Sequence, residues 1–204
     1  MKYDSPGGAA AYRAKYERSW LRKLSHRREM ALVRRALARA GVGTGGRILD
    51  CPGGCGRLLP VLAPFAQRLV AADRARDMVL LARAAAPGAG HLVAALPRLP
   101  FLTKSFETAV CHRLLHHLRE RDARLALLRE LARVTRGSVV VSFQDAGTAK
   151  ARWFRGRGKP RSRHVMAPAE LEREARDCGL QPAGAALRLN GLFSTLAIAV
   201  FRTV

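Results

Sequence analysis

One stretch of the sequence could bring bare backbone N–H groups up to a ligand. In RILDCPGGCGR, residues 47–57, an apolar segment that predicts a buried strand ends at an acid, Asp50. The turn that follows contains Gly53, Gly54 and Gly56. Apolar residues with helical spacing come next, and the N-terminus of a helix favours electron-rich ligand groups. These residues indicate a nucleotide-like cofactor. The alternative is an ordinary strand-to-helix connection, because tight turns of many kinds use glycine.

A second acid is placed where it could complete such a site. The segment RLVAAD, residues 68–73, predicts a short buried strand that ends at Asp73. This acid lies about twenty residues beyond the glycine turn, the distance at which an acid on the next strand can bond a ribose hydroxyl pair. A surface aspartate at the end of a strand is the alternative interpretation.

Three histidines, His112, His116 and His117, stand at the end of a fourth predicted strand, residues 107–112. In open α/β sheets ligands gather outside the carboxyl ends of the strands, so a histidine at this point faces the expected reaction zone. Neutral imidazole can take a proton from a hydroxyl or amine, and His116 is the candidate base. A capping or core role is the alternative. A metal is not expected, because no carboxylate or cysteine at metal-ligand spacing completes a site.

The elements that must position these residues alternate along the chain. Beyond the first strand, further strands are predicted at residues 68–73, 91–95, 107–112 and 138–144, with helices between them, the clearest at residues 122–134. A helix that begins at Pro168 then precedes two strands, Gln181–Leu189 and Ser194–Arg202. Their short connection at Asn190 and Gly191 requires these two strands to be antiparallel.

Three stretches resemble motifs of the class I S-adenosylmethionine-dependent methyltransferases. ILDCPGGCGR is similar to the first motif, an acid followed by small residues, with Pro52, Gly54 and Gly56 at the small-residue positions. ADRARDMVLLAR is similar to the second motif, and LPFLTKSFETAVCHRLLHHL, residues 99–118, to the region around the fourth strand. The resemblance covers roughly residues 47–202 and is strongest to the type 11 domain, which is typified by quinone-biosynthesis methyltransferases.

The resemblance implies both a fold and a cofactor. The fold would be α/β, with a Rossmann-like, seven-stranded, mostly parallel sheet, helices on both faces and a C-terminal antiparallel strand. RVTRGS, residues 133–138, would be the turn before the fifth strand. The cofactor would be S-adenosyl-L-methionine, with Asp50 at its amino acid part and Asp73 at its ribose. Where the family often carries an adenine-contacting aspartate this chain has Ala95, so a backbone group of Ala95 or Leu96 would serve. The residues expected to bind the cofactor are Asp50, Pro52, Gly53, Gly54, Gly56, Asp73, Met78, Ala95, Leu96 and Cys111.

The net charge of +22, with arginine as 31 of the 37 basic residues, bears on the methyl acceptor. Such a surface attracts phosphate-bearing partners, but we favour a compositional bias, because no RNA-recognition or helix-turn-helix signature accompanies the charge. Residues 145–166 are strongly basic and contain Trp153 and Phe154, which suits an anionic acceptor, a nucleic acid or an acidic membrane surface, with a solvated charge run as the alternative. We expect methyl transfer to a small-molecule or lipid-like acceptor. An RNA methyltransferase and a non-catalytic S-adenosylmethionine-binding protein are the alternatives.

Length and composition indicate one domain, residues 1–204, in which an N-terminal helical cap, residues 1–43, precedes a Rossmann-like core, residues 47–204. The cap would contain a helix over residues 9–40 whose Tyr12, Tyr16 and Trp20 either cover the cofactor or pack on the domain. No apolar run is long enough to span a membrane, no secretory signal is visible, and scattered cysteines fit a reducing compartment, so a cytoplasmic location is expected. Nothing in the sequence indicates the oligomeric state.

Overall fold

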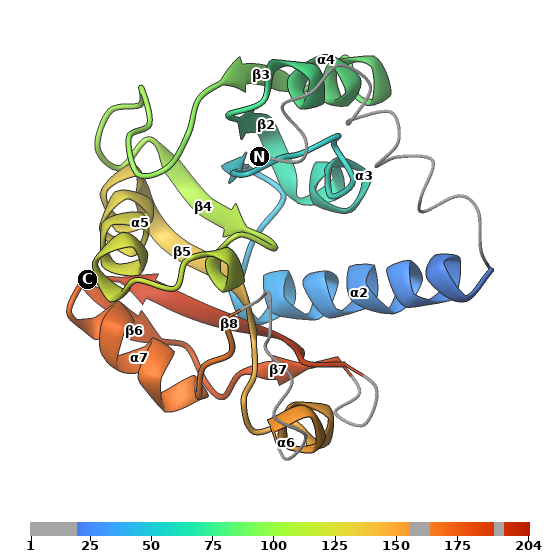
Figure 1. The fold of residues 1–204 in the computed structure, drawn as a ribbon. Helices are drawn as coiled ribbons and strands as arrows, with labels where there is room; N and C mark the ends of the chain where they lie inside the picture. Colours follow the sequence, from blue (N-terminus) through green and yellow to red (C-terminus); the bar gives the residue numbers. More distant parts are fainter. Residues whose placement is uncertain (1–19, 156–163, 190–193) are drawn as a thin grey trace.

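The computed structural model describes residues 20–155, 164–189 and 194–204, which fold around one eight-stranded sheet (Figure 1). The strand order is β3-β2-β1-β4-β5-β8-β6, and β7 pairs with β8 beside this path. The strands are β1 (Gly46–Asp50), β2 (Ala66–Asp73), β3 (Gly90–Val93), β4 (Phe106–Cys111), β5 (Thr135–Gln144), β6 (Leu180–Pro182), β7 (Leu187–Arg188) and β8 (Leu196–Thr203). Strands β1 to β5 pair in parallel, and β8 is antiparallel to β5, β6 and β7. The mostly parallel α/β fold with a C-terminal antiparallel strand is therefore confirmed.

Helices cover both faces of this sheet (Figure 1). They are α2 (Trp20–Arg39), α3 (Leu59–Leu62), α4 (Arg76–Ala85), α5 (Arg121–Val134), α6 (Ala149–Arg155) and α7 (Pro168–Arg176), with 3₁₀ turns η1 (Ala63–Phe65) and η2 (Leu115–His117). Successive side chains of a strand point to opposite faces. In β1, Ile48 therefore packs in the layer that contains Leu37 of α2, while Leu49 packs in the layer that contains Leu128 of α5. The alternation places β1, β4 and β5 between two apolar layers.

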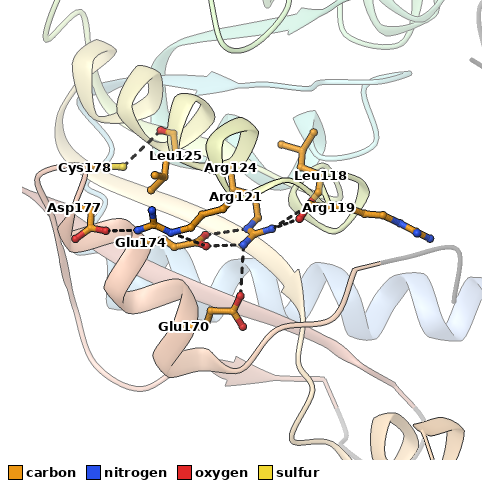
Figure 2. Close-up of polar contacts among 9 residues, drawn as sticks. All are labelled: Leu118, Arg119, Arg121, Arg124, Leu125, Glu170, Glu174, Asp177 and Cys178. Atoms are coloured by element: carbon orange, nitrogen blue, oxygen red, sulfur yellow. Dashed lines mark hydrogen bonds and ion pairs between the residues drawn. The ribbon is translucent and has the colours of Figure 1, made fainter.

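Helices α5 and α7 are joined by a buried ion pair (Figure 2). Arg124 of α5 donates from Nε and Nη2 to the two carboxylate oxygens of Glu174 in α7, at 2.9 and 2.6 Å. Both side chains are 4% exposed. Nη1 of Arg124 also donates to the backbone carbonyl of Arg119, at 2.6 Å. The pair fixes α7 against α5 at a site from which water is largely excluded.

The end of the sheet differs from the expected pair of strands, because the strand before the last one is divided into β6 and β7. Five residue steps from Pro182 to Leu187 lie opposite three steps from Phe201 to Ile198, so the chain bulges out between the two pairings. Gly184 permits this, since its φ of +100° is a conformation that other residues rarely adopt. The sheet consequently has eight strands rather than the seven expected.

The helix after the glycine turn is much shorter than its apolar spacing indicated. Helix α3 spans four residues, Leu59–Leu62, and a 3₁₀ turn follows at once. Pro64 lies in that turn. Proline has no N–H to continue the α-helical hydrogen bonds, so the helix cannot extend through this residue.

The turn expected at residues 133–138 is absent. Helix α5 ends at Val134 and β5 begins at Thr135, so the chain enters the sheet directly from the helix. Gly137 lies within the strand, where an added Cβ would stand 2.5 Å from the carbonyl oxygen of Glu107. This glycine therefore serves the close approach of β5 to β4 rather than a turn.

The expected N-terminal helix is present as α2, and its earlier part, with Tyr12 and Tyr16, lies outside the described residues. Trp20 is 70% exposed, so it does not pack on the domain. The second half of α2 does pack, because Ala36 and Leu37 are fully buried in the layer beneath the sheet. The described part of this helix is thus a structural layer of the core.

The basic segment, residues 145–166, contains α6, and its two ends are held together. Ala146 N–H donates to the carbonyl of Met166, and Met166 N–H donates to that of Gln144, both at 3.0 Å. Residues 156–163 and the turn expected at 190–191 lie outside the described residues. Across the part of the chain that the structure describes, we find no helix with the length and apolar character needed to cross a membrane.

Candidate active site

Asp50 is a buried acid that ends strand β1. Its neighbours in the sheet are Ala71 of β2 and Val110 of β4, and its side chain is fully buried. Neither carboxyl oxygen has a hydrogen-bond partner among the described residues. Burial, and then the nearby charge of Asp73, raises the pKa of Asp50 well above its ordinary value. Such a group needs either a proton or a ligand that donates to it.

Asp73 ends the neighbouring strand β2, and its carboxylate hydrogen-bonds both the glycine turn and the residue before α4. Its Oδ2 accepts the N–H of Gly54 at 2.8 Å, and its Oδ1 accepts the N–H of Ala75 at 2.9 Å. The side chain is 8% exposed. The structure therefore brings Asp50, Asp73 and the glycine turn together, as the sequence indicated.

The glycines of the turn differ in how closely other parts of the chain approach them. Gly56 has a φ of +81°, and an added Cβ would lie 3.1 Å from the Cα of Ala82, so this glycine lets α4 pack closely against the turn. Gly54 has a φ of +53°, and an added Cβ would meet no described atom within 4 Å. Gly53 donates its N–H to the carbonyl of Ala72, and Pro52 is half-buried. The turn leaves open space at Gly54.

Four other residues expected at the cofactor are also close to this edge, but in different surroundings. Met78 is 5% exposed and packs with Cys55, and Cys111 is fully buried in the core. Ala95 is exposed, and its carbonyl accepts the N–H of Arg98 at 3.1 Å. Leu96 is half-buried, and its backbone hydrogen-bonds the Cys51 thiol. The side chains of Met78 and Cys111 thus face protein, and contact of these four residues with a cofactor stays a prediction.

His116, the base expected from the sequence, lies in η2. Its side chain is 3% exposed, and the centroid of its ring lies 4.3 Å from that of His117. Its carbonyl accepts the N–H of His164 at 2.8 Å, which ties η2 to the end of the basic segment. Its role as a base stays a prediction.

Sequence reasoning missed Glu29, an acid of α2 that is 1% exposed. Its Oε1 accepts from Nε2 of His112 and from Nε of Arg113, each at 2.6 Å. Its Oε2 accepts from Nη2 of Arg113 at 3.0 Å and from Nη2 of Arg57 at 3.1 Å. One signal was available, since Glu29 is the single acid of α2 and stands four residues before the buried Val33 on the apolar face.

The chain has relatives of known class. Residues 49–143 match the family model described as a methyltransferase domain. No curated protein sequence matches the chain.

Solved structures share the fold over most of the chain. Magnesium protoporphyrin IX methyltransferase from Synechocystis PCC 6803, with bound SAH, has a TM-score of 0.78 at 17% identity, covering 99% of this chain and 97% of that chain. The protein in complex with the Haloferax volcanii Trm112 methyltransferase activator has a TM-score of 0.73 at 19% identity, covering 99% and 96%. A Thermotoga maritima SAM-dependent methyltransferase has a TM-score of 0.66 at 17% identity, covering 95% and 97%.

These structural likenesses show the fold, and the family match includes Asp50, Asp73 and His112. Residues 49–143 therefore carry a type 11 methyltransferase domain, and the chain has the fold of S-adenosylmethionine-dependent methyltransferases.

Proposed function

We propose that this enzyme methylates a small-molecule or lipid-like acceptor, and that the glycine turn with Asp50 and Asp73 holds S-adenosylmethionine. The observation that carries the cofactor site is the carboxyl of Asp50, which is fully buried and has no hydrogen-bond partner among the described residues. A buried carboxyl of this kind fits a ligand that brings a cationic or hydrogen-bonding group. The amino acid part of S-adenosylmethionine has such a group, its ammonium.

The other residues of the edge fit the remaining parts of the cofactor. Each carboxylate oxygen of Asp73 accepts one backbone N–H, and a carboxylate oxygen can accept a second hydrogen bond, so Asp73 can still receive a ribose hydroxyl pair. The open space at Gly54 allows a ligand to approach the backbone. When bound, the cofactor supplies a methyl group that its sulfonium makes electrophilic. The residues of the chain need mainly to bind, align the reactants and exclude water.

A small acceptor is supported by the family and by the likeness to magnesium protoporphyrin IX methyltransferase, which spans nearly the whole of both chains. This support is an analogy at the level of the fold, because acceptor sites vary within one fold. Methyl-incorporation assays with panels of small hydroxyl- and amine-bearing compounds test the acceptor class.

Calorimetry with S-adenosylhomocysteine tests the cofactor site. We expect the wild type to bind, and Asp50→Asn and Asp73→Asn each to weaken binding by about tenfold or more, or 1.4 kcal/mol. Asp77→Asn is the matched control, because Asp77 is an exposed acid in the first turn of α4. Absence of binding to the wild type would leave only a scaffold with the fold, and unchanged binding to both variants would remove the two acids from the site.

An RNA acceptor is the second candidate, and α6 favours it. Lys150, Arg152 and Trp153 of this helix are exposed, a combination of positive charge and aromatic surface that suits RNA. RNA-dependent methyl incorporation, with RNA affinity that falls steeply as salt is raised, would support this candidate. Incorporation into small molecules without RNA would exclude it.

A further inference from the structure

Glu29 connects α2 to two functional segments of the sheet edge. Among its partners, His112 and Arg113 directly follow β4, where a methyl acceptor is expected, and Arg57 directly follows the glycine turn. His26, one helical turn earlier in α2, also contacts Nη2 of Arg57, at 3.1 Å. One buried acid therefore fixes the end of β4 relative to the cofactor turn.

The contact with Glu29 decides which ring nitrogen of His112 carries the proton. Burial opposes ionisation of Glu29, but the hydrogen bonds from His112 and Arg113 outweigh it and hold the pKa of this carboxyl well below its usual range. An ionised carboxylate only accepts hydrogen bonds, so Nε2 of His112 must be the donor across 2.6 Å. Burial lowers the pKa of His112, which makes the ring neutral and leaves the lone pair on Nδ1. Nδ1 has no hydrogen-bond partner among the described residues.

The backbone is strained at the next residue. Arg113 has a φ of +61°, in the left-handed region that residues other than glycine rarely occupy. Its N–H donates to Oγ of Ser142 in β5 at 2.7 Å, and its guanidinium donates twice to Glu29. A strained backbone conformation persists where surrounding contacts hold it in place, and such conformations cluster at functional sites. The strained residue and Glu29 together hold His112 in place.

We propose that Glu29 is a positioning residue of the methyl-transfer site, and that His112, oriented by it, accepts the proton of the methyl acceptor at Nδ1. The inference rests on the proposed function. His112 lies two residues beyond Val110, which pairs with Asp50 in the sheet. The imidazole of His112 and the carboxyl of Asp50 therefore lie at the same edge of the sheet. The acceptor class that needs such a group carries a proton on its nucleophile, as a hydroxyl or an amine does.

The proton step balances on the residues present. As the oxygen or nitrogen of the acceptor gains the methyl group, its O–H or N–H bond breaks and the proton passes to Nδ1 of His112. The resulting imidazolium keeps its Nε2–H toward Glu29, whose negative charge stabilises it, while Arg57 and Arg113 oppose it. His26 is a further titratable group of this cluster. Release of the proton to water restores the neutral ring.

The inference moves the base from His116 to His112. The structure shows His112 in contact with a carboxylate at 2.6 Å. A carboxylate favours the imidazolium that forms when a proton is accepted.

Nuclear magnetic resonance of the full chain labelled with ¹⁵N-histidine tests the inference without an identified acceptor, because it distinguishes protonated from unprotonated ring nitrogens. His112→Gln identifies the signals of His112. We expect Nε2 to be protonated and Nδ1 unprotonated at pH 7 in the wild type. In Glu29→Gln we expect the pKa of His112 to fall and the preference for Nε2–H to be lost.

An Nδ1–H tautomer in the wild type, or an unchanged titration in Glu29→Gln, overturns the role of Glu29. The wild-type spectrum decides the tautomer even if Glu29→Gln does not fold.

S-adenosylhomocysteine calorimetry on the same samples separates this inference from the proposed function. A wild type that does not bind overturns the proposed function while the tautomer is still measured. With an acceptor from the panel, His112→Gln should lower kcat by about 10²-fold or more with little change in the KM for S-adenosylmethionine. Full turnover by His112→Gln overturns its role as the base.

Discussion

Two buried carboxyl groups, Glu174 of α7 and Asp50 of β1, stand in opposite situations. Glu174 is 3% exposed and receives two hydrogen bonds from the guanidinium of Arg124 (Figure 2). Asp50 is fully buried and receives none from the described residues. The hydrogen bonds to Glu174 raise the pKa of Arg124 and so favour its charged form, whereas burial raises the pKa of Asp50 and favours its neutral form.

The difference supports our proposal that Asp50 serves binding, whereas Glu174 serves folding. A buried carboxyl without a partner costs stability, and a chain keeps such a group most readily where a ligand provides the partner. A buried and fully bonded ion pair needs no ligand. The comparison predicts that substitutions in the two regions change stability in opposite directions.

The largest effect is expected for Glu174→Gln. The change leaves the buried guanidinium of Arg124 without its carboxylate, and removal of one partner of a buried pair costs about 3–5 kcal/mol. Urea unfolding measures the loss, and binding of S-adenosylhomocysteine to the folded fraction should not change. A loss below about 1 kcal/mol would show that the pair does not fix α7 to α5.

Asp50→Asn should instead stabilise the protein without cofactor, by about 1–3 kcal/mol at pH 7. Because the folded-state pKa of Asp50 is raised, the wild type has its full stability below the ordinary aspartate pKa and loses it as pH rises toward the folded-state value. The asparagine variant lacks this loss. Thermal unfolding across pH should therefore show curves that coincide near pH 4 and separate as pH rises. A variant less stable than the wild type at pH 7 would indicate that Asp50 has a structural partner.

The smallest effect is expected for Arg121→Ala, at the exposed rim of the same helix pair. Nη2 of Arg121 lies 2.7 Å from Oδ2 of Asp177, but the two side chains are 57% and 50% exposed. Solvent-exposed pairs contribute about 0–1 kcal/mol, so the unfolding midpoint should hardly move. A loss comparable to that of Glu174→Gln would show that burial is not what distinguishes the two pairs.

Much of the fold, and the placement of Asp50 and Asp73 at one edge of the sheet, could be predicted from local sequence. Asp50 and Asp73 each end an apolar run, and parallel strands bring such ends to one edge. The short α3 and the division of the strand into β6 and β7 could not be predicted from the spacing of apolar residues. They depend on Pro64, which ends the helix, and on Gly184, which permits the bulge.

The cluster around Glu29 could not be predicted in the same way. Glu29 is separated from Arg57 by 28 residues, from His112 by 83 and from Arg113 by 84. A single sequence does not indicate that such distant residues meet, because α2 reaches them only through its packing on the sheet. The sequence thus indicated histidines at the end of β4, but not the carboxylate that His112 contacts.

The central claim, that Asp50 is a buried acid awaiting a cationic ligand, is tested most directly by proton release. Calorimetric titration of S-adenosylhomocysteine at pH 7, in buffers of different ionisation enthalpy, counts the protons exchanged on binding. We predict that binding releases a proton from the wild type, as Asp50 ionises beside the ligand ammonium, and releases none from Asp50→Asn. Tight binding to the wild type with an enthalpy independent of the buffer would contradict the claim.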